Sequence, residues 1–138
     1  MKKKIIVCFF GVISRSIRFT HNNIQRNLID VIKNNNYEVD IYVFNNNVEN
    51  CMIDGCCVNN NDYKLLNPTF FEEITQKQID TIIDTEITTK NINCVSGYYR
   101  MRNPNSANKV IRNCIRHLYS EEQVGNFIEK NKDKYDAA

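Results

Sequence analysis

The feature that most constrains this chain is an uninterrupted apolar segment close to its start. Residues 4–10 read K-I-I-V-C-F-F, a run of β-branched and aromatic side chains, and Gly11 follows. Such a run is typical of a strand that is covered on both faces in a parallel sheet. The apolar stretch from Ile5 to Ile13 is much too short for a membrane-spanning helix. We therefore expect a buried first strand in a protein without a membrane span.

A helix and a second strand follow this segment. Apolar side chains recur at helical spacing after Asn22, and the asparagines at 34–36 end the helix. Residues 38–44 (E-V-D-I-Y-V-F) have the pattern of a second strand. Strand, turn, helix and strand in this order form a βαβ unit. The sequence therefore predicts an α/β protein, namely a Rossmann-like three-layer α/β/α domain with a mainly parallel sheet. The apolar positions expected on the inner helix face are Ile24, Leu28, Ile29, Val31 and Ile32.

The rest of the chain predicts a loop and further helices within a single domain of residues 1–138. Residues 45–62 are polar and rich in asparagine, which is typical of a long loop or insertion. Thr69 and Glu72 have capping-box spacing and predict a helix that continues through Asp84, with Ile74, Ile79, Ile82 and Ile83 on its inward face. We expect a short strand within 87–95. Residues 134–138 read as the approach to a strand outside the sequence.

Two more helix starts are predicted near the end of the chain, at Asn105 or Ser106 and at Ser120. The inward positions expected on these two helices are Val110, Ile111, Cys114, Ile115, Leu118, Val124, Phe127 and Ile128.

The charge is distributed in blocks. Residues 1–40 carry seven Lys or Arg against three Asp or Glu, residues 41–90 three against eight, and residues 91–138 eight against five. A nucleic-acid-binding domain concentrates positive charge on one face, so we expect no nucleic-acid partner. Two basic flanks suit a smaller anionic ligand, although a solvated surface is the commoner explanation.

The number and spacing of the cysteines indicate whether the protein belongs to a reducing or an oxidising compartment. The chain has six cysteines but no C-x-x-C pair, which disfavours a zinc site. Cys8 and Cys114 lie in apolar segments and read as small buried residues. We expect a reduced, cytoplasmic protein, although a Cys51–Cys56 or Cys57–Cys94 bridge stays open. A secretory signal is the less favoured interpretation of the first residues, because no small-x-small cleavage site follows the apolar run.

The turn after the first strand is the most informative candidate site. In an open parallel sheet, ligands bind beyond the carboxyl ends of the strands, and the helix N-terminus there favours phosphate. Gly11 permits close approach of a ligand, and arginine pairs with phosphate through two hydrogen bonds. The alternative is a surface turn whose arginines are solvated. The candidate binding residues are Phe10, Gly11, Ser14, Arg15 and Arg18, with Asn45 at the end of the second strand.

Other chemistry-bearing groups give weaker signals. The cluster at 98–102 (Y-Y-R-M-R) is either an anion site or a surface that straddles the core, and the second interpretation is favoured. The basic stripe of Lys109, Arg112 and Arg116 is expected to be a solvated helix face. The sequence has no G-x-G-x-x-G, P-loop or D-x-D motif. We therefore assign no catalytic residue and no metal ligand.

These features together resemble a known family. The segment at 6–17 (I-V-C-F-F-G-V-I-S-R-S-I), the helix ending at 30–35 and the strand at 39–45 are similar to the opening of the glycosyltransferases that use sugar nucleotides and are common in giant DNA viruses. Residues 131–136 (N-K-D-K-Y-D) resemble the segment before the third main strand of that family. The similarity covers about residues 4–47 well and 95–138 loosely.

The resemblance implies a GT-A-like α/β fold in which the first strand-end loop holds a nucleotide-diphospho-sugar donor. Phe10, Gly11, Ser14 and Arg15 occupy the matching loop. The family's acidic metal-binding motif would lie beyond residue 138, so Mn²⁺ or Mg²⁺ is expected only in a longer protein with a C-terminal catalytic region. The location is then the host cytoplasm or the virion. The alternative is a non-catalytic interaction module, with a homodimer as one form of it, that keeps the fold without the metal motif.

Overall fold

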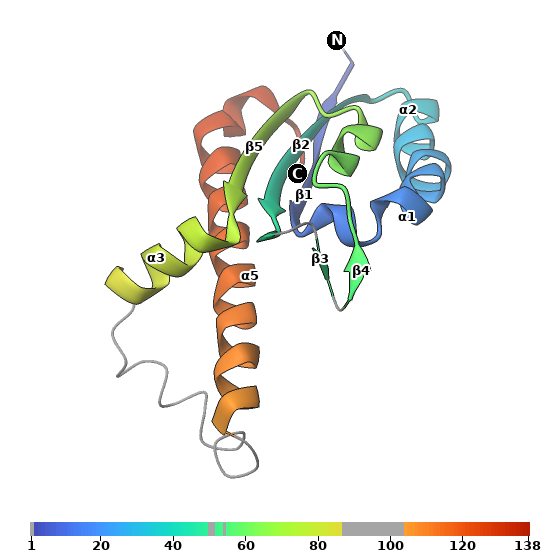
Figure 1. Cartoon of the computed structure of the whole chain (residues 1–138). Coiled ribbons are helices and arrows are strands. Elements are labelled where there is room, and N and C mark those ends of the chain that lie inside the picture. Colours follow the sequence, from blue (N-terminus) through green and yellow to red (C-terminus); the bar gives the residue numbers. More distant parts are fainter. Residues whose placement is uncertain (1, 50–51, 54, 87–103) are drawn as a thin grey trace.

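The computed structural model describes residues 2–49, 52–53, 55–86 and 104–138. It is an α/β protein built on a three-stranded parallel sheet (Figure 1). The strands are β1 (Lys4–Gly11), β2 (Glu38–Asn47) and β5 (Phe70–Thr75), and their order in the sheet is β1-β2-β5. The predicted α/β class is therefore confirmed, and the arrangement is compatible with a Rossmann-like fold.

The central strand β2 forms the middle of the core. Its residues from Ile41 to Asn46 are all buried, and successive side chains point to opposite faces of the sheet. Ile41 and Val43 therefore belong to one apolar cluster, whereas Tyr42 and Phe44 belong to another. The strand is longer than predicted, because Asn45, Asn46 and Asn47 continue the ladder with β5.

One face of the sheet is covered by a helix that follows β1. Three consecutive segments make up this helix: α1 (Ile17–Ile24), the π-helical segment η2 (Gln25–Ile29) and α2 (Asp30–Asn34). Ile17 and Ile29 pack against the cluster that contains Ile41 and Val43. The predicted start after Asn22 was wrong, because Ile17 buries its side chain and the helix begins there. Leu28 and Val31, expected inside, are exposed.

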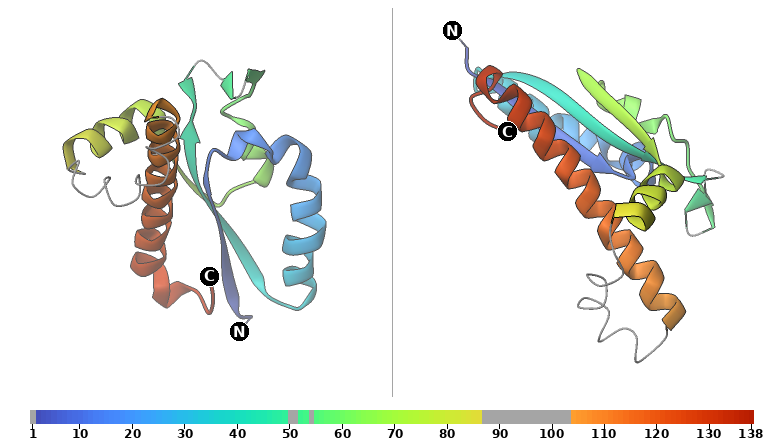
Figure 2. Two further views of the ribbon diagram at one scale, coloured as in Figure 1. Left: turned by 90° about the horizontal axis from the view of Figure 1, so that it is seen from below. Right: turned by 90° about the vertical axis from the view of Figure 1, so that its left-hand side faces the viewer.

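The other face of the sheet is covered by α5 (Pro104–Asn131), and Figure 2 shows α5 and α1 on opposite sides of the strands. The rings of Phe127 on α5 and Tyr42 on β2 stack with their centroids 3.9 Å apart. The sequence predicted two helices here, the second starting at Ser120. The structure has one continuous helix, and Ser120 lies inside it. Of the residues expected inside, Cys114 and Leu118 are exposed, whereas Val124 is buried.

The third strand of the sheet lies where the sequence predicted the start of a helix. Thr69 and Glu72 do not cap a helix, because residues 70–75 form β5 and pair with β2. The helix α3 (Gln76–Glu86) starts six residues later. Its capping box is formed by Thr75 and Gln78: Thr75 Oγ1 accepts from the Gln78 amide at 3.2 Å, and Gln78 Oε1 accepts from the Thr75 amide at 2.9 Å. Ile79 and Ile83 are buried as expected.

The predicted loop at 45–62 contains regular structure. After β2, the described residues form a small antiparallel pair, β3 (Met52–Ile53) and β4 (Cys56–Cys57). The 3-10 turn η4 (Asp62–Leu66) follows and packs against α1. A second 3-10 turn, η1 (Ile13–Arg15), joins β1 to α1. The sequence predicts none of these short elements, because each depends on packing against a neighbour rather than on periodicity.

The end of the chain returns to the sheet. After α5, the 3-10 turn η5 (Lys132–Lys134) leads into a parallel bridge between Ala137 and Ile5. The predicted approach to a further strand therefore pairs with β1, on the edge opposite β2. The predicted strand within 87–95, the cluster at 98–102 and the bridges that involve Cys51 or Cys94 lie outside the described residues.

Candidate functional site

The carboxyl ends of β1 and β2 bring the loop after β1 next to the asparagines of β2. Gly11 ends β1 in register with Asn45. Gly11 has a φ of 93°, a conformation that an L side chain rarely adopts, and it is buried. This positive φ turns the chain from the strand into η1. The predicted site residues Gly11 and Asn45 are thus neighbours, and Ser14 and Arg15 follow on η1.

The N-terminus of α1 lies at the end of this loop and is not capped by the protein. Ser16 precedes the helix, but its side chain makes no capping hydrogen bond, and the first turn has no acidic residue. The first intrahelical acceptor is the Ser16 carbonyl, which accepts hydrogen bonds from the amides of Phe19 and Thr20. The amides of Ile17 and Arg18 come earlier in the helix and have no intrahelical acceptor. An uncapped helix N-terminus attracts anions through these amides and the helix dipole.

Three buried polar atoms of η1 and β2 have no hydrogen-bond partner among the described residues. Ser14 is 4% exposed, and its hydroxyl has no hydrogen-bond partner among the described residues. The side-chain carbonyl oxygens of Asn45 and Asn46 are likewise buried without a donor in the described part of the chain. Buried polar atoms nearly always have partners, so bound water would satisfy these three atoms, and a ligand group could take the place of water at Ser14 on η1.

Asn45 is held rigidly in place. Its Nδ2 donates to Asn47 Oδ1 at 2.7 Å and to the main-chain carbonyl of Asn60 at 3.1 Å. The residue is completely buried. The sequence predicted direct contact between Asn45 and a ligand. In the structure, the Asn45 side-chain amide ties the end of β2 to the chain before η4, and its contact with a ligand stays a prediction.

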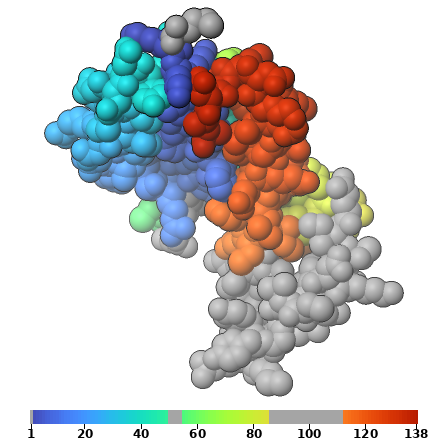
Figure 3. Space-filling model, turned by 180° about the vertical axis from the view of Figure 1, so that it is seen from behind, coloured from blue at the N-terminus to red at the C-terminus, as the bar shows by residue number. Residues whose placement is uncertain are grey.

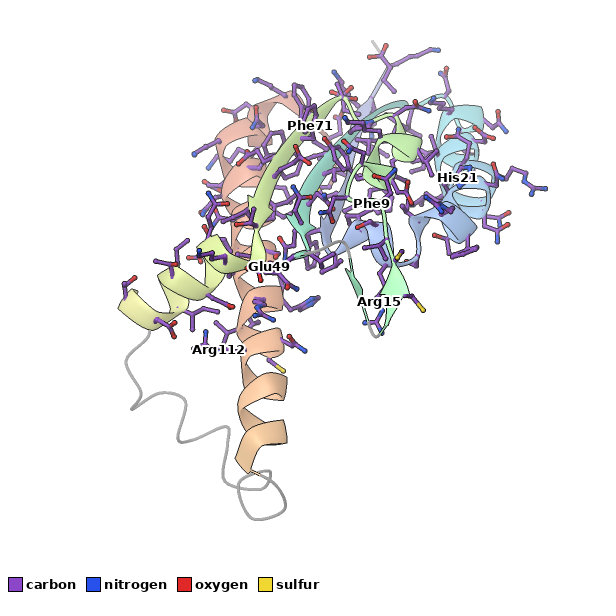
Figure 4. All side chains as sticks on the ribbon, in the orientation of Figure 1. Phe9, Arg15, His21, Glu49, Phe71 and Arg112 are labelled. Carbon is purple, nitrogen blue, oxygen red and sulfur yellow. The ribbon has the colours of Figure 1, made fainter. Side chains whose placement is uncertain are left out.

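The two arginines of the loop have different surroundings. Arg18 forms an ion pair with Asp62 on η4, with Nε 3.0 Å from Oδ2 and Nη2 3.3 Å from Oδ1. Asp62 is only 8% exposed, so this pair joins α1 to η4 and occupies the Arg18 guanidinium. Arg15 is exposed, and Figure 4 shows its side chain beyond the carboxyl end of the sheet, on the side of β3 and β4. Both arginine side chains are exposed, and the Arg18 guanidinium is the one that the structure pairs with Asp62.

Phe10 lies on the opposite face of the sheet from the cluster beside α1. Its ring packs against His117 on α5, with the centroids 5.2 Å apart. The predicted set of site residues is therefore divided: Phe10 faces α5, and Arg18 is engaged with Asp62. The loop from Gly11 to Ser16 and the neighbouring Arg15 remain together at the start of α1.

The helix α5 contributes residues that sequence reasoning missed. Ser120 is completely buried and accepts a 2.9 Å hydrogen bond from Asn46 Nδ2 at the end of β2. The sequence singled out Ser120 because its spacing to Gln123 is that of a helix cap, but the residue lies inside α5 and bonds to β2 instead. Arg116 was expected in solvent, yet it binds Asp80 on α3 through two bonds of 2.9 and 2.6 Å. These residues attach α5 to β2 and to α3.

Metal ligands are not gathered anywhere in the described ranges. No group of three or more His, Cys, Asp or Glu side chains comes together there in a way that could hold a metal ion. The described residues therefore do not form a recognisable Mn²⁺ or Mg²⁺ site, and we assign no ligand to either ion. Within the same ranges, no helix is both long and apolar enough to cross a membrane.

The chain was also compared with known proteins. No family model, no curated protein and no solved structure matches it.

Proposed function

We propose that this protein binds a nucleotide sugar through its diphosphate, at the loop between β1 and α1. The observation that carries the proposal is the N-terminus of α1 without a side-chain cap, which is joined through η1 to a parallel strand that ends at a glycine with positive φ. Helix N-termini in this position offer main-chain amides to phosphate oxygens. The buried hydroxyl of Ser14, without a partner among the described residues, supplies one more donor at the same place.

The order of the strands supports the proposal. The sheet order is β5-β2-β1, and Ala137 lies on the far side of β1. Numbered along the chain, this is the order 3-2-1-4, in which the connections reverse direction at β1. Doubly wound α/β proteins bind their ligands at this reversal, beyond the carboxyl ends of the strands. We therefore include in the proposal a Rossmann-like three-layer fold with α1 and α5 on its two faces.

A glycosyltransferase role, a viral origin and a cytoplasmic location belong to the same proposal and rest on the resemblance of residues 4–47. Among the described residues, no group of three or more His, Cys, Asp or Glu side chains gathers to hold a metal ion, so the proposal is limited to binding of the donor. We propose that this chain contributes donor binding, with Arg15 and the amides of Ile17 and Arg18 on the diphosphate.

The first test is a thermal unfolding assay with UDP-, GDP- and CMP-sugars at millimolar concentration, with and without Mn²⁺. The proposal expects a higher melting temperature with at least one of them, because a ligand that binds only the folded state stabilises it. Inorganic pyrophosphate should compete. The absence of any shift in a folded sample would refute nucleotide binding.

Substitution of Ser16 gives a sharper test. Ser16→Asp places a carboxylate at the helix N-terminus, which should stabilise the protein by about 0.3–1 kcal/mol. The same carboxylate repels and replaces the diphosphate, so affinity should fall about tenfold or more. Ser16→Asn is the matched neutral control and should keep the affinity. Equal affinities for the two variants would contradict binding at α1.

A second candidate function is a protein-interaction module. It is favoured by Phe19, which is 82% exposed on α1, and by Phe70 and Phe71, which are 42% and 52% exposed on β5. Exposed apolar surface of this kind is a candidate contact area for a protein partner. Sedimentation analysis would separate the two functions: a dimer at micromolar concentration that nucleotides do not change favours the interaction module.

A further inference from the structure

The two edges of the sheet differ in what covers them. At the β1 edge, the Ile6 amide donates to the Ala137 carbonyl at 3.0 Å, and Figure 3 shows the red end of the chain against the blue first strand. The opposite edge is β5, which forms the border of the sheet in Figure 1. Within the described part of the chain, no strand pairs with the outer side of β5. A strand edge of this kind is a template for an added strand.

The main-chain groups that β5 turns outward follow from its pairing with β2. The Thr69 amide, directly before the strand, donates to the Ile41 carbonyl at 2.8 Å. Odd-numbered residues of β5 therefore turn their amides and carbonyls toward β2, because the direction of these groups alternates along a strand. Phe70 and Glu72 turn theirs outward. No described residue outside the sheet forms a main-chain hydrogen bond with these two residues.

Each face of β5 presents one phenylalanine and one glutamate at this edge. The four side chains are all exposed: Phe70, Phe71, Glu72 and Glu73. Phe70 packs beside Phe127 on the α5 side of the sheet, with the ring centroids 5.7 Å apart. Phe71 packs beside Tyr63 on the η4 side, with the ring centroids 5.4 Å apart. Because successive side chains alternate between the faces, one glutamate follows each ring on its own face.

The two glutamates have hydrogen-bond partners but no counter-ion. Glu72 Oε1 accepts from the Tyr42 hydroxyl at 3.1 Å, and Glu73 Oε1 accepts from Asn47 Nδ2 at 3.4 Å. Neither carboxylate forms an ion pair with a residue of the described ranges. Both faces of the edge therefore carry negative charge, and opposite charges across a strand pair stabilise it. An added strand with positive side chains at these positions would neutralise the edge.

A second copy of this chain does not suit the edge. A two-fold pairing of β5 with its copy is antiparallel, and its hydrogen bonds require outward, even-numbered residues to lie opposite even-numbered ones. When the two strands overlap along most of their length, Glu72 or Glu73 then lies opposite the same residue of the copy. Like charges directly opposite each other destabilise a strand pair. The charge of the edge therefore favours a different, basic partner.

We propose that the outer edge of β5 binds an extended segment of a partner protein in which two basic residues precede two β-branched apolar residues. This order follows from antiparallel pairing, which is the more stable arrangement per residue. The basic residues then lie opposite Glu73 and Glu72, and the apolar residues lie opposite Phe71 and Phe70. Main-chain hydrogen bonds supply affinity, and the carboxylates and rings select the sequence. The inference does not depend on nucleotide binding.

The test measures binding of a fluorescent peptide, Thr-Val-Arg-Arg-Val-Val, to the full chain by fluorescence anisotropy. The matched peptide Thr-Val-Glu-Glu-Val-Val should bind at least about tenfold more weakly, because it places like charges opposite the edge. A third peptide keeps both arginines but is N-methylated at its first valine and second arginine, whose amides face β5. It should also bind at least about tenfold more weakly, because it cannot donate these hydrogen bonds to the strand.

Variants of the chain locate the peptide on β5. Glu73→Lys should prefer, by about tenfold, a peptide with glutamate in place of the first arginine. Glu38→Gln is the matched control and should change no affinity, because Glu38 is exposed but precedes the β2 residues that pair with β5. Hydrogen exchange is a second readout. Bound peptide should slow the amides of Phe70 and Glu72 at least about tenfold and leave the Phe71 amide, which faces β2, unchanged.

Three outcomes would overturn the proposal. The first is that the arginine peptide does not bind, or binds no better than the glutamate peptide. The second is full affinity of the N-methylated peptide, since charge alone would then hold it. The third is strong protection of the Phe70 and Glu72 amides without peptide, since the edge would then be occupied already. Nucleotide sugars are titrated separately and should leave the peptide affinity unchanged, so failure of one proposal does not decide the other.

Discussion

Asn46 at the carboxyl end of β2 donates its Nδ2 to Ser120 Oγ in the middle of α5, and the two atoms are 2.9 Å apart. The Ser120 hydroxyl in turn donates to the Arg116 carbonyl at 2.8 Å. Both Asn46 and Ser120 are buried. This bond joins α5 to the carboxyl end of β2 and adds one buried polar contact to an interface that is otherwise formed by apolar side chains.

Removal of this contact should destabilise the fold. Ser120→Ala leaves the buried Asn46 amide without its acceptor, which costs about 1–3 kcal/mol. Urea denaturation gives the free energy of unfolding. Ser16→Ala is a matched control, because the Ser16 side chain makes no capping bond, and it should change stability by less than about 0.5 kcal/mol. If Ser120→Ala is neutral, the buried hydrogen bond does not contribute as the geometry implies.

Two glycines should respond to alanine with opposite signs. Gly11 has a φ of 93°, so Gly11→Ala strains the backbone by about 1 kcal/mol or more, although no atom lies within 4 Å of the new Cβ. Gly125 lies inside α5, also with open space around it, and Gly125→Ala should stabilise the helix by about 0.5–1 kcal/mol. Thermal unfolding of both variants tests this pair. A stabilising Gly11→Ala would mean that β1 does not need the left-handed turn before η1.

The end of the chain should detach at high pH. Tyr135 donates its hydroxyl to Asp40 Oδ2 at 2.8 Å, and burial, followed by this bond, raises the pKa of Tyr135 to about 12. A raised pKa means that the contribution of Tyr135 is complete below its ordinary pKa of 10 and is lost as the pH rises toward 12. Hydrogen exchange at the Ile6 amide, which bonds Ala137, should report the detachment.

Tyr135→Phe is the control for this prediction. It removes the titrating hydroxyl and one hydrogen bond, so stability at neutral pH should fall by about 1 kcal/mol. The additional loss between pH 10 and 12 should then become smaller than in the parent protein. An unchanged alkaline profile would show that another group, and not Tyr135, controls the attachment.

The contact between α3 and α5 should weaken in acid. The hydrogen bonds from Arg116 lower the pKa of Asp80 despite partial burial. A lowered pKa means that this stabilisation is present above the carboxyl's ordinary value near 4 and is lost as the pH falls through the folded-state pKa. Asp80→Asn should therefore destabilise the protein by about 1 kcal/mol at pH 7, and the difference from the parent should disappear in strong acid.

The matched variant for this contact is Arg116→Lys. It keeps the charge but loses the two-bond geometry to Asp80, so it should recover only part of the stability. Full recovery would reduce the contact to a simple charge effect. Asp84→Asn is a second control. Asp84 pairs with Arg112 in a more exposed position, and its removal should cost less.

Local sequence determined the elements whose side chains carry a complete pattern. The apolar run of β1 and the pattern of 38–44 predicted two parallel strands with a helix between them. The prediction was possible because the order of apolar and polar residues along such segments follows the periodicity of the strand or helix. The end of the first strand at Gly11 was also predicted, whereas the start of the following helix at Ile17 was not. Burial of Ile79 and Ile83 in α3 followed from helical spacing, even though the start of that helix was misplaced.

Tertiary structure decided what short signals left ambiguous. Thr69 and Glu72 have the spacing of a helix cap, yet pairing with β2 makes residues 70–75 a strand, because the ladder satisfies more backbone groups than one cap does. Ser120 has the spacing of a cap as well, but it lies inside α5, where it meets Asn46. The sequence predicted that Arg18 binds an anionic ligand, and in the structure its guanidinium forms an ion pair with Asp62 on η4. Partners distant in the chain determine these roles, and no local pattern encodes where such partners lie.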